Sequence, residues 1–449
     1  MALTFFGGIK IENKKYSRSK QLRHIPPPNV VYIPIKEPVK YLVTTKDSVR
    51  LGQAVAFCDN ELCFSSVSGT VKGIAREGRK RYIAIENDKK NTPYEGLKGV
   101  DKPLTVLRFE EICSLLRQYA IIDSFDKIFL YEKLLSIKRK AKRIIINCCE
   151  HDPYATSIFR LIKEKPKELI AGAKILMHAL SVGKCIFVIE QDKKNAIADI
   201  IEFINDDDMF ITAFIESKYP INEKTIMSAV YGKEIPYGKS AIDIGYVFFG
   251  AEAVIQIFDS FLTGIPQTTK AVTVSGECIA NPSNLIVPLG TPIKELIDEC
   301  GGVIGKCKYV VCGGLMNGEY MSNAGGVVTH LSDQFLFLNR SGKHRGDCIK
   351  CGRCIEVCPM YLPPMDYANS AENNKHIDIN SYYGISACIE CGCCEYICPT
   401  GVPLLDIIRS AKQKTPKDQQ KGTKTTSKMF TVNRRKWHRD NDDDIFIPF

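Results

Sequence analysis

Between residues 104 and 265, apolar residues alternate between the spacing of amphipathic helices and the short continuous runs of buried strands. The pattern predicts helices over Phe109–Tyr119, Pro153–Leu161 and Lys194–Ile204, and strands over Arg143–Asn147 and Cys185–Ile189. This alternation is typical of an α/β domain with a largely parallel sheet. Ligands of such sheets lie at the carboxyl ends of the strands, so a cofactor is expected at the loop that follows Asn147.

Residues 29–100 show a different pattern, in which short β-branched runs are separated by turn residues. The runs VVYIPI, YLVTT and RYIAIE are the clearest of these predicted strands. They indicate a small β barrel-sandwich that looks like the biotinyl/lipoyl type. Carrier domains of that type bear a cofactor on a lysine at a hairpin tip, but residues 56–67 contain no lysine. We therefore interpret this domain as structural.

Strand patterns return over residues 270–330, with the runs VTVSGE, LIVPLG and KYVVCGG and one short helix over Ile293–Cys300. This order predicts a β-grasp-like (SLBB) module. A chain of 449 residues is too long for a single core, and these patterns divide it into several domains. The α/β domain, the barrel-sandwich and this module precede a cysteine-rich domain over residues 340–412.

Both ends of the chain are basic and account for its formal net charge of +10. Residues 1–28 indicate a basic extended arm, and residues 413–449 a basic disordered tail. Such segments suit anionic lipid head groups or an acidic redox partner, with a merely solvated surface as the alternative. The basic runs lack interleaved aromatic residues and a recognised motif, so we expect no nucleic acid partner. No run of 18 apolar residues occurs, so no membrane span is expected.

Two cysteine runs carry the chemistry: Cys348-x-x-Cys351-x-x-Cys354-x-x-x-Cys358-Pro and Cys388-x-x-Cys391-x-x-Cys394-x-x-x-Cys398-Pro. Each is the spacing of a [4Fe-4S] cube, and the fourth cysteine of such a run ligates the other cluster. We therefore predict an α-helical ferredoxin-type domain that holds two [4Fe-4S] clusters. The ligands of cluster 1 are Cys348, Cys351, Cys354 and Cys398, and those of cluster 2 are Cys388, Cys391, Cys394 and Cys358.

The alternative for paired Cys-x-x-Cys units is a structural zinc site. Zinc would leave Cys354, Cys358, Cys394 and Cys398 unexplained, so we favour two cubes, which carry single electrons. Cys393 has no place in the pattern and is interpreted as a packed neighbour. The other ten of the 19 cysteines are irregularly spaced and indicate a reducing cytosol. For Cys58 and Cys63 we favour two partly buried thiols over a redox pair.

The order of these segments resembles the RnfC component of the Rnf complex, the ion-translocating ferredoxin:NAD⁺ oxidoreductase. That component is similar to the 51 kDa flavin subunit of complex I. The resemblance extends from Phe5-Phe6-Gly7-Gly8-Ile9 through Ile25-Pro26-Pro27-Pro28 and Asn281-Pro282-Ser283-Asn284 to the two cysteine runs. It implies docking on the cytoplasmic side of a membrane assembly, hydride exchange with NAD(H) through FMN, and relay of single electrons.

The departures from this family fall on the flavin site. Its glycine-rich segment resembles GxGGAGFPTxxKL, but residues 122–134 contain no glycine, and only Lys133 and Leu134 match. Side chains such as Phe125 and Asp126 would occupy the space of the flavin. The family's YPxGxE segment appears as Tyr219-Pro220-Ile221-Asn222-Glu223, again without its glycine. We therefore expect no FMN at residues 122–134, and we doubt NAD(H) binding and NADH oxidation by this chain.

A second family segment, NGxECEPY, corresponds to residues 147–154. Asn147, Glu150, Pro153 and Tyr154 match, and Asp152 keeps a negative charge. With Lys133, the residues Asn147, Glu150 and Asp152 are the candidates for a remnant FMN or NAD site. The alternative, which we favour, is a strand end and helix cap with Asp152 at the N-cap and Pro153 at the first helical position.

The resemblance leaves three functions open. The chain is an electron-transfer subunit of an Rnf-type complex, with membrane-embedded subunits and a ferredoxin-like or other redox protein as partners. Alternatively, it is a paralogue that delivers electrons to a soluble reductase, such as a proline reductase, or it is a structural docking subunit. We favour the first function and a cytoplasmic location, with attachment to the inner face of the cell membrane as an open alternative.

Overall fold

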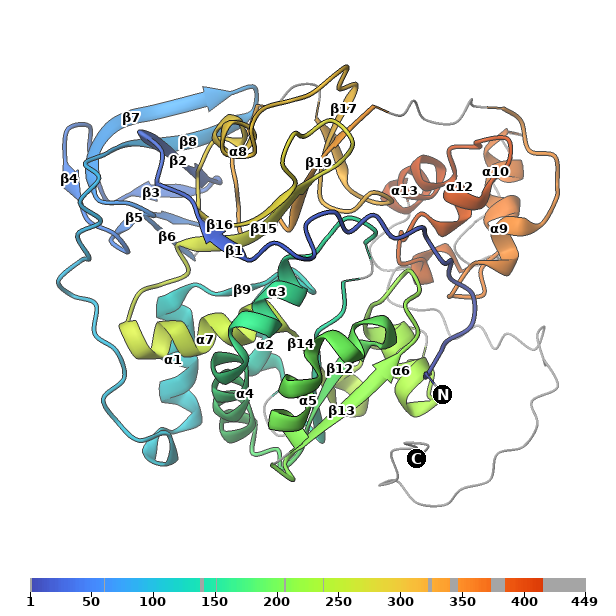
Figure 1. Cartoon of the computed structure of the whole chain (residues 1–449), viewed down its shortest axis with the longest axis horizontal. Helices are drawn as coiled ribbons and strands as arrows, with labels where there is room; N and C mark the ends of the chain where they lie inside the picture. Colours follow the sequence, from blue (N-terminus) through green and yellow to red (C-terminus); the bar gives the residue numbers. More distant parts are fainter. Residues whose placement is uncertain are drawn as a thin grey trace. The chain divides into compact units, whose positions relative to one another are not determined.

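The computed structural model describes residues 2–59, 61–137, 141–150, 152–205, 207–236, 238–321, 325–339, 346–372 and 384–414 (Figure 1). The chain divides into two compact units. One comprises residues 12–212 and 245–341, and the other residues 1–11, 213–244 and 342–449. Most of the predicted basic tail, from residue 415 onward, lies outside the described residues, as does His151. Among the described helices, none is long and apolar enough to cross a membrane.

The predicted barrel-sandwich forms from two small sheets. The first has the order β2-β8-β7-β4, with β2 (Val30–Ile35), β8 (Lys80–Asn87), β7 (Gly69–Glu77) and β4 (Ser48–Val49). The second has the order β3-β5-β6, with β3 (Val39–Tyr41), β5 (Ala54–Cys58) and β6 (Glu61–Phe64). Alternate residues of β2 point into a core that includes Val31, Val55 and Ile83. This alternation is the pattern of a strand that is buried on one face.

The α/β domain contains the predicted parallel sheet, in the order β13-β12-β11-β14. Its strands are β13 (Phe210–Ile215), β12 (Cys185–Glu190), β11 (Arg143–Asn147) and β14 (Tyr246–Gly250). β11 is parallel to both β12 and β14. The accompanying helices are α1 (Phe109–Tyr119), α2 (Leu130–Ile137), α3 (Ser157–Glu164), α4 (Pro166–Leu180), α5 (Ala198–Asn205) and α7 (Ala251–Thr263). β11 and β12 are buried along nearly their whole length. This burial explains why their sequences are continuous apolar runs.

Two predicted helix boundaries are wrong. The helix expected to begin at Pro153 is α3, which begins at Ser157 with Thr156 as its N-cap residue. The helix expected from Lys194 is divided into a 3-10 helix, η2 (Gln191–Ile197), and α5. Asp152 and Pro153 therefore belong to the loop after β11 and do not cap a helix.

The SLBB-like module is a mixed sheet with the order β1-β16-β15-β19-β17-β18. Its strands are β1 (Leu22–His24), β16 (Ser283–Pro288), β15 (Thr269–Ser275), β19 (Gln334–Leu338), β17 (Tyr309–Cys312) and β18 (Glu319–Met321). The helix predicted from Ile293 is α8 (Ile293–Glu299). β1 comes from the N-terminal arm and pairs in parallel with β16. The arm is therefore in part a strand of this sheet.

Ion pairs engage four basic residues of the arm. Lys10 pairs with Glu216 at 2.5 Å and Lys14 with Glu277 at 2.9 Å. Arg18 and Arg23 pair with Asp192 and Glu299. These contacts give the basic residues of the arm a role in holding it to the folded chain.

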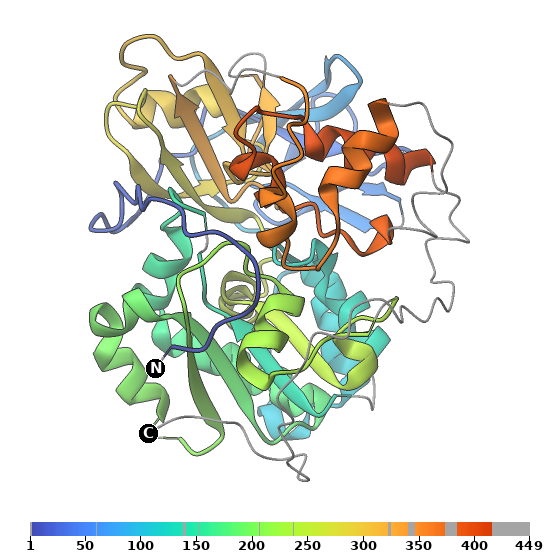
Figure 2. The ribbon, with the colours of Figure 1, turned by 90° about the vertical axis from the view of Figure 1, so that its right-hand side faces the viewer.

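The C-terminal cluster domain, drawn in orange and red, is helical (Figure 2). It contains α9 (Arg353–Glu356), α10 (Pro364–Glu372), the 3-10 helix η4 (Ile385–Ala387), α12 (Cys393–Ile397) and α13 (Leu404–Lys414). Leu362, Tyr367, Ile385, Leu404 and Ile408 form its apolar core together with the cysteines. The same compact unit contains residues 2–11 and α6 (Glu223–Tyr231).

Candidate cluster sites and cofactor site

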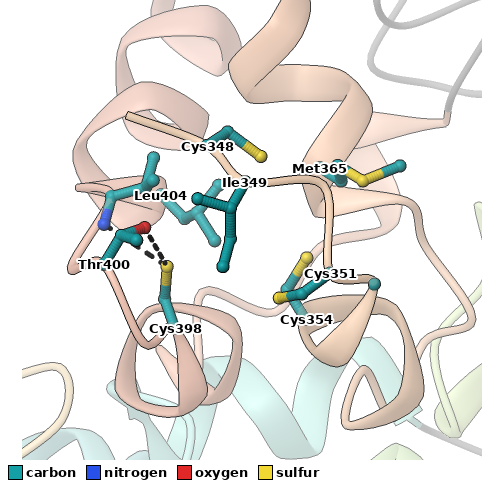
Figure 3. A pocket seen from close by; sticks show the side chains of 10 residues that line it. Cys348, Ile349, Cys351, Cys354, Met365, Cys398, Thr400 and Leu404 are labelled. Carbon is teal, nitrogen blue, oxygen red and sulfur yellow. Dashed lines mark hydrogen bonds between the residues drawn. The ribbon is translucent and has the colours of Figure 1, made fainter. Parts of the chain in front are cut away.

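The first candidate cluster site is a cavity lined by four thiols, those of Cys348, Cys351, Cys354 and Cys398 (Figure 3). Cys348 and Cys351 lie in the loop before α9, Cys354 lies on α9, and Cys398 follows α12. Ile349, Met365, Val402 and Leu404 supply an apolar part of the wall. The fold thus brings together the four cysteines that the sequence assigns to cluster 1, although one of them belongs to the other run.

The second candidate site is a cavity lined by Cys358, Cys388, Cys391 and Cys394, the four cysteines assigned to cluster 2. Cys393 also lines it. Cys358 follows α9, whereas Cys388, Cys391 and Cys394 surround the start of α12. The two runs therefore exchange their fourth cysteines between the cavities, and each run contributes to both.

Backbone amides near both sites point at sulfur. The N–H of Val402 donates to Sγ of Cys398 at 3.4 Å, and the N–H of Leu362 donates to Sγ of Cys358 at 3.4 Å. In both runs the donor lies four residues after the fourth cysteine. Hydrogen bonds of this kind stabilise the negative charge of a thiolate-bound cluster and tune its potential.

The sulfurs line each cavity without converging on one point. In the described part of the chain, no three His, Cys, Asp or Glu side chains come together closely enough to hold a single metal ion. A structural zinc ion needs four ligands at one atom, whereas the four thiolates of a [4Fe-4S] cube are distributed over four irons. Each cavity is lined by four of the cysteines that the sequence assigns to a cube, which is the number of thiolates that a [4Fe-4S] cluster takes.

The candidate cofactor residues at the carboxyl end of β11 are brought together, and one side-chain oxygen of each accepts a backbone N–H, whereas Oε2 of Glu150 is buried without a hydrogen-bond partner among the described residues. Oδ1 of Asn147 accepts the N–H of Cys149 at 3.2 Å. Oε1 of Glu150 accepts the N–H of Ile158 at 2.6 Å, in the first turn of α3. Oδ2 of Asp152 accepts the N–H of Leu315 at 2.7 Å.

A buried charge network that the sequence did not reveal lies beside these residues. Glu190, at the end of β12, pairs with Lys193, and Nζ of Lys193 lies 3.6 Å from Glu150. Burial alone would raise the pKa of Glu190, but Lys193 and Lys15 hold it at about 2. Nζ of Lys15 donates to the carbonyl oxygens of Glu150, Asp152 and Ala155 at 2.7–2.9 Å.

The contacts of Lys133 differ from those of Asn147, Glu150 and Asp152. Its Nζ bonds Oδ2 of Asp123 at 2.8 Å and Oδ2 of Asp126 at 2.6 Å, and its side chain is buried. Burial raises the pKa of Asp126, which Lys133 partly offsets. The ammonium group also lies 4.7 Å from the ring centroid of Phe249, on β14.

The YPxGxE-like segment begins a helix. The side chain of Asn222 caps α6 by accepting the N–H groups of Lys224 and Thr225, both at 3.0 Å. The hydroxyl of Tyr219 donates to the carbonyl oxygen of Cys391 at 2.6 Å. The segment therefore contacts the second candidate cluster site.

Four family models match the chain, in the order that the sequence predicted. The RnfC barrel sandwich hybrid domain matches residues 3–90, and the Nuo51 FMN-binding domain matches residues 126–259. The SLBB domain matches residues 271–321, and the 4Fe-4S dicluster domain matches residues 347–402. The predicted fold class is confirmed.

A solved structure of an NAD⁺-reducing [NiFe]-hydrogenase in the air-oxidized state aligns over 53% of this chain and 49% of that chain. Its TM-score is 0.38, at 12% sequence identity. That likeness is too weak to carry a conclusion.

Curated relatives are similar over most of the chain. The C component of the proton-translocating ferredoxin:NAD⁺ oxidoreductase complex of Clostridium ljungdahlii is 30% identical over 383 residues, covering 81% of this chain and 83% of that protein. The C component of the Na⁺-translocating complex of Acetobacterium woodii is 28% identical, covering 83% and 88%. The C component of the ion-translocating oxidoreductase complex of Haemophilus influenzae is 29% identical, covering 83% and 48%. The chain belongs to the RnfC family, the C components of the Rnf-type, ion-translocating ferredoxin:NAD⁺ oxidoreductase complexes.

Proposed function

We propose that this chain is the iron-sulfur relay of an Rnf-type complex, passing single electrons through two [4Fe-4S] clusters. The observation that carries the proposal is the pair of cavities, each lined by the four cysteines that the sequence assigns to one cluster, which come from both cysteine runs. Cysteines 348, 351, 354 and 398 hold cluster 1, and cysteines 388, 391, 394 and 358 hold cluster 2. The clusters supply one-electron chemistry; the protein supplies the thiolates, the N–H···S bonds and the apolar walls.

The partners follow from the family. The relatives are named as subunits of ion-translocating complexes, and an ion can be translocated only by subunits that are embedded in the membrane. We place this chain at the cytoplasmic face of such an assembly as a peripheral subunit, with a ferredoxin-like or other redox protein as its electron partner.

We propose further that the Nuo51-type domain of this chain does not bind FMN. The support is the packing at the carboxyl end of β14, where both carboxylate oxygens of Asp123 accept the N–H of Gly250 at 3.1 Å. A Cβ atom on Gly250 would lie 2.7 Å from Oδ1 of Asp123, so this carboxylate fills the space beside the strand end. Phe125 stacks on Phe248, with ring centroids 5.9 Å apart.

These residues do not fit a flavin phosphate. A phosphate needs backbone N–H groups or cations that are free to bind it. Here the cation, Lys133, is neutralised by Asp123 and Asp126, and their carboxylates would repel the phosphate. The side chains of residues 122–129 thus replace the glycine-lined surface that the resemblance requires.

NAD(H) binding is likewise not proposed for this domain. Glu150 and Asp152, the matched acidic residues, accept backbone N–H groups of Ile158 and Leu315. Lys15 covers the carbonyl groups of the same loop. In this proposal, NADH is oxidised by a different subunit or by a partner protein.

The test is an anaerobic analysis of the purified full chain. Iron, acid-labile sulfide and flavin are quantified, and the visible absorbance is followed after addition of NADH and then of dithionite. We expect about eight irons, no stoichiometric flavin, no bleaching by NADH, and bleaching by dithionite. Stoichiometric FMN with bleaching by NADH would refute the proposal for the Nuo51-type domain, and an iron content near zero would refute the relay itself.

A further inference from the structure

Cys393 is a ninth thiol in the cluster domain that the two cysteine runs do not employ. It is the first residue of α12, and its side chain is 0% exposed. It lines the second cavity beside Cys391 and Cys394. Cluster 2 already has four cysteines, so this thiol is left over as a protonated neighbour of the ligands.

The S–H group of Cys393 has two acceptors within reach. One is the carbonyl oxygen of Tyr219, 3.8 Å from Sγ. The other is the sulfur of Cys391, two residues earlier, which lines the same cavity. A thiol has one proton to donate, so the two acceptors compete for it.

The competing carbonyl is held in place by a short antiparallel contact. The N–H of Ile9 donates to the oxygen of Tyr219 at 2.8 Å, and the N–H of Tyr219 donates to the oxygen of Ile9 at 2.9 Å. A Cβ atom on Gly8 would lie 2.6 Å from the same oxygen, so the N-terminal segment can approach only because residue 8 is glycine. The hydroxyl of Tyr219 anchors the ring to the carbonyl of Cys391.

We propose that Cys393 is a positioning residue that raises the reduction potential of cluster 2 by donating its S–H to the Cys391 thiolate, with the Tyr219 carbonyl as the alternative acceptor. This inference rests on the proposed function, because it requires cluster 2 at Cys391. Reduction adds one electron to the cluster and makes its ligand sulfurs better acceptors. The S–H···S bond therefore strengthens in the reduced state and favours it, while the proton stays on Cys393.

The first cysteine run has no thiol at the position that corresponds to Cys393. The residue equivalent to Cys393, between a glycine and the third cysteine, is Arg353, and its side chain is exposed. Cluster 1 therefore has no buried donor at this position. The two clusters should differ in potential in part for this reason, with cluster 2 shifted to the more positive side.

The test is an anaerobic redox titration of the full chain, followed by electron paramagnetic resonance, for wild type, Cys393→Ala and Cys393→Ser. The alanine variant should keep about eight irons, and the potential of one cluster should become more negative. An ordinary hydrogen bond changes an equilibrium constant by about two- to tenfold, and tenfold corresponds to 59 mV for one electron. The serine variant retains a donor and should return the potential toward the wild-type value. Cys113→Ala, on α1, removes a buried thiol of the other unit and should change neither potential.

The outcomes separate this inference from the proposed function. Eight irons and unchanged potentials in Cys393→Ala would overturn the donor role. About four irons in that variant would show that Cys393 is a ligand and overturn it as well. A wild-type chain without clusters would instead refute the proposed function, and this inference with it.

Discussion

Nζ of Lys133 lies 2.8 Å from Oδ2 of Asp123, and both side chains are buried. The resemblance to the flavin subunits assigns this lysine to a cofactor site. In this chain it neutralises Asp123 and the partly buried Asp126. The three residues form an internal ion cluster beside the end of β14, where Asp123 also accepts the N–H of Gly250.

Removing the lysine should destabilise the α/β domain strongly. Lys133→Met leaves the carboxylate of Asp123 buried without a counter-ion, which costs about 3–5 kcal/mol. The measurement is urea unfolding of the full chain followed by circular dichroism. The control is the triple variant in which Asp123→Asn and Asp126→Asn accompany Lys133→Met, and it should recover most of the loss. A single variant as stable as wild type would show that the lysine is not needed for packing.

The N-terminal arm should contribute to stability through Lys15. Lys15→Met removes the donor to three carbonyl oxygens of the loop after β11. Unsatisfied buried acceptors cost about 1–3 kcal/mol, so the thermal midpoint should fall. Lys20→Met is the matched control, because Lys20 is exposed in the same arm and its loss should leave the midpoint unchanged. Equal midpoints for the two variants would contradict the structural role of the arm.

Local sequence patterns predicted those elements whose formation depends on residues close together in the sequence. The spacing of the cysteines, the alternation in β2 and the helix Phe109–Tyr119 are set by neighbouring residues, and the structure reproduces them. The cysteines are also grouped as predicted, because the exchange of fourth cysteines is a property of the paired motif. Their role as ligands stays a prediction.

The parts that could not be predicted depend on contacts between distant residues. Glu150 looked like a cofactor residue, yet it accepts an N–H of α3 and lies near Lys193. Lys15 donates to residues 135 to 140 positions away, and no periodicity marks such a contact. The expected start of a helix at Pro153 was wrong because Asp152 accepts backbone N–H groups of Tyr154 and Leu315 and is not an N-cap.

His330 should make stability depend on pH. Burial and the nearby Lys270, which pairs with Glu252 and Asp333, lower the pKa of His330 from 6.5 to about 4, against a hydrogen bond to the backbone of Gln267. The unfolded chain then binds more protons between pH 6.5 and pH 4, so the contribution of His330 is complete above pH 6.5 and is lost as the pH falls toward 4.

Between pH 8 and pH 5.5 this loss amounts to about 1.4 kcal/mol in the free energy of unfolding. The check is urea unfolding of the full chain at both pH values. His330→Asn removes the titrating ring, so its stability should fall by about 1.4 kcal/mol less than that of wild type over this range. Identical falls for the two proteins would contradict a neutral His330 in the folded chain.

The exchange of the fourth cysteines gives the sharpest test of the ligand assignment. Cys398→Ser lies in the second run but should change the same electron paramagnetic resonance signal as Cys354→Ser, because both thiols line the first cavity. Cys358→Ser lies in the first run but should change the other signal, as Cys394→Ser does. Serine preserves size, so the four variants differ mainly in which cavity loses a thiolate. If each run instead held its own cluster, Cys398→Ser would group with Cys394→Ser, and the assignment by cavities would be wrong.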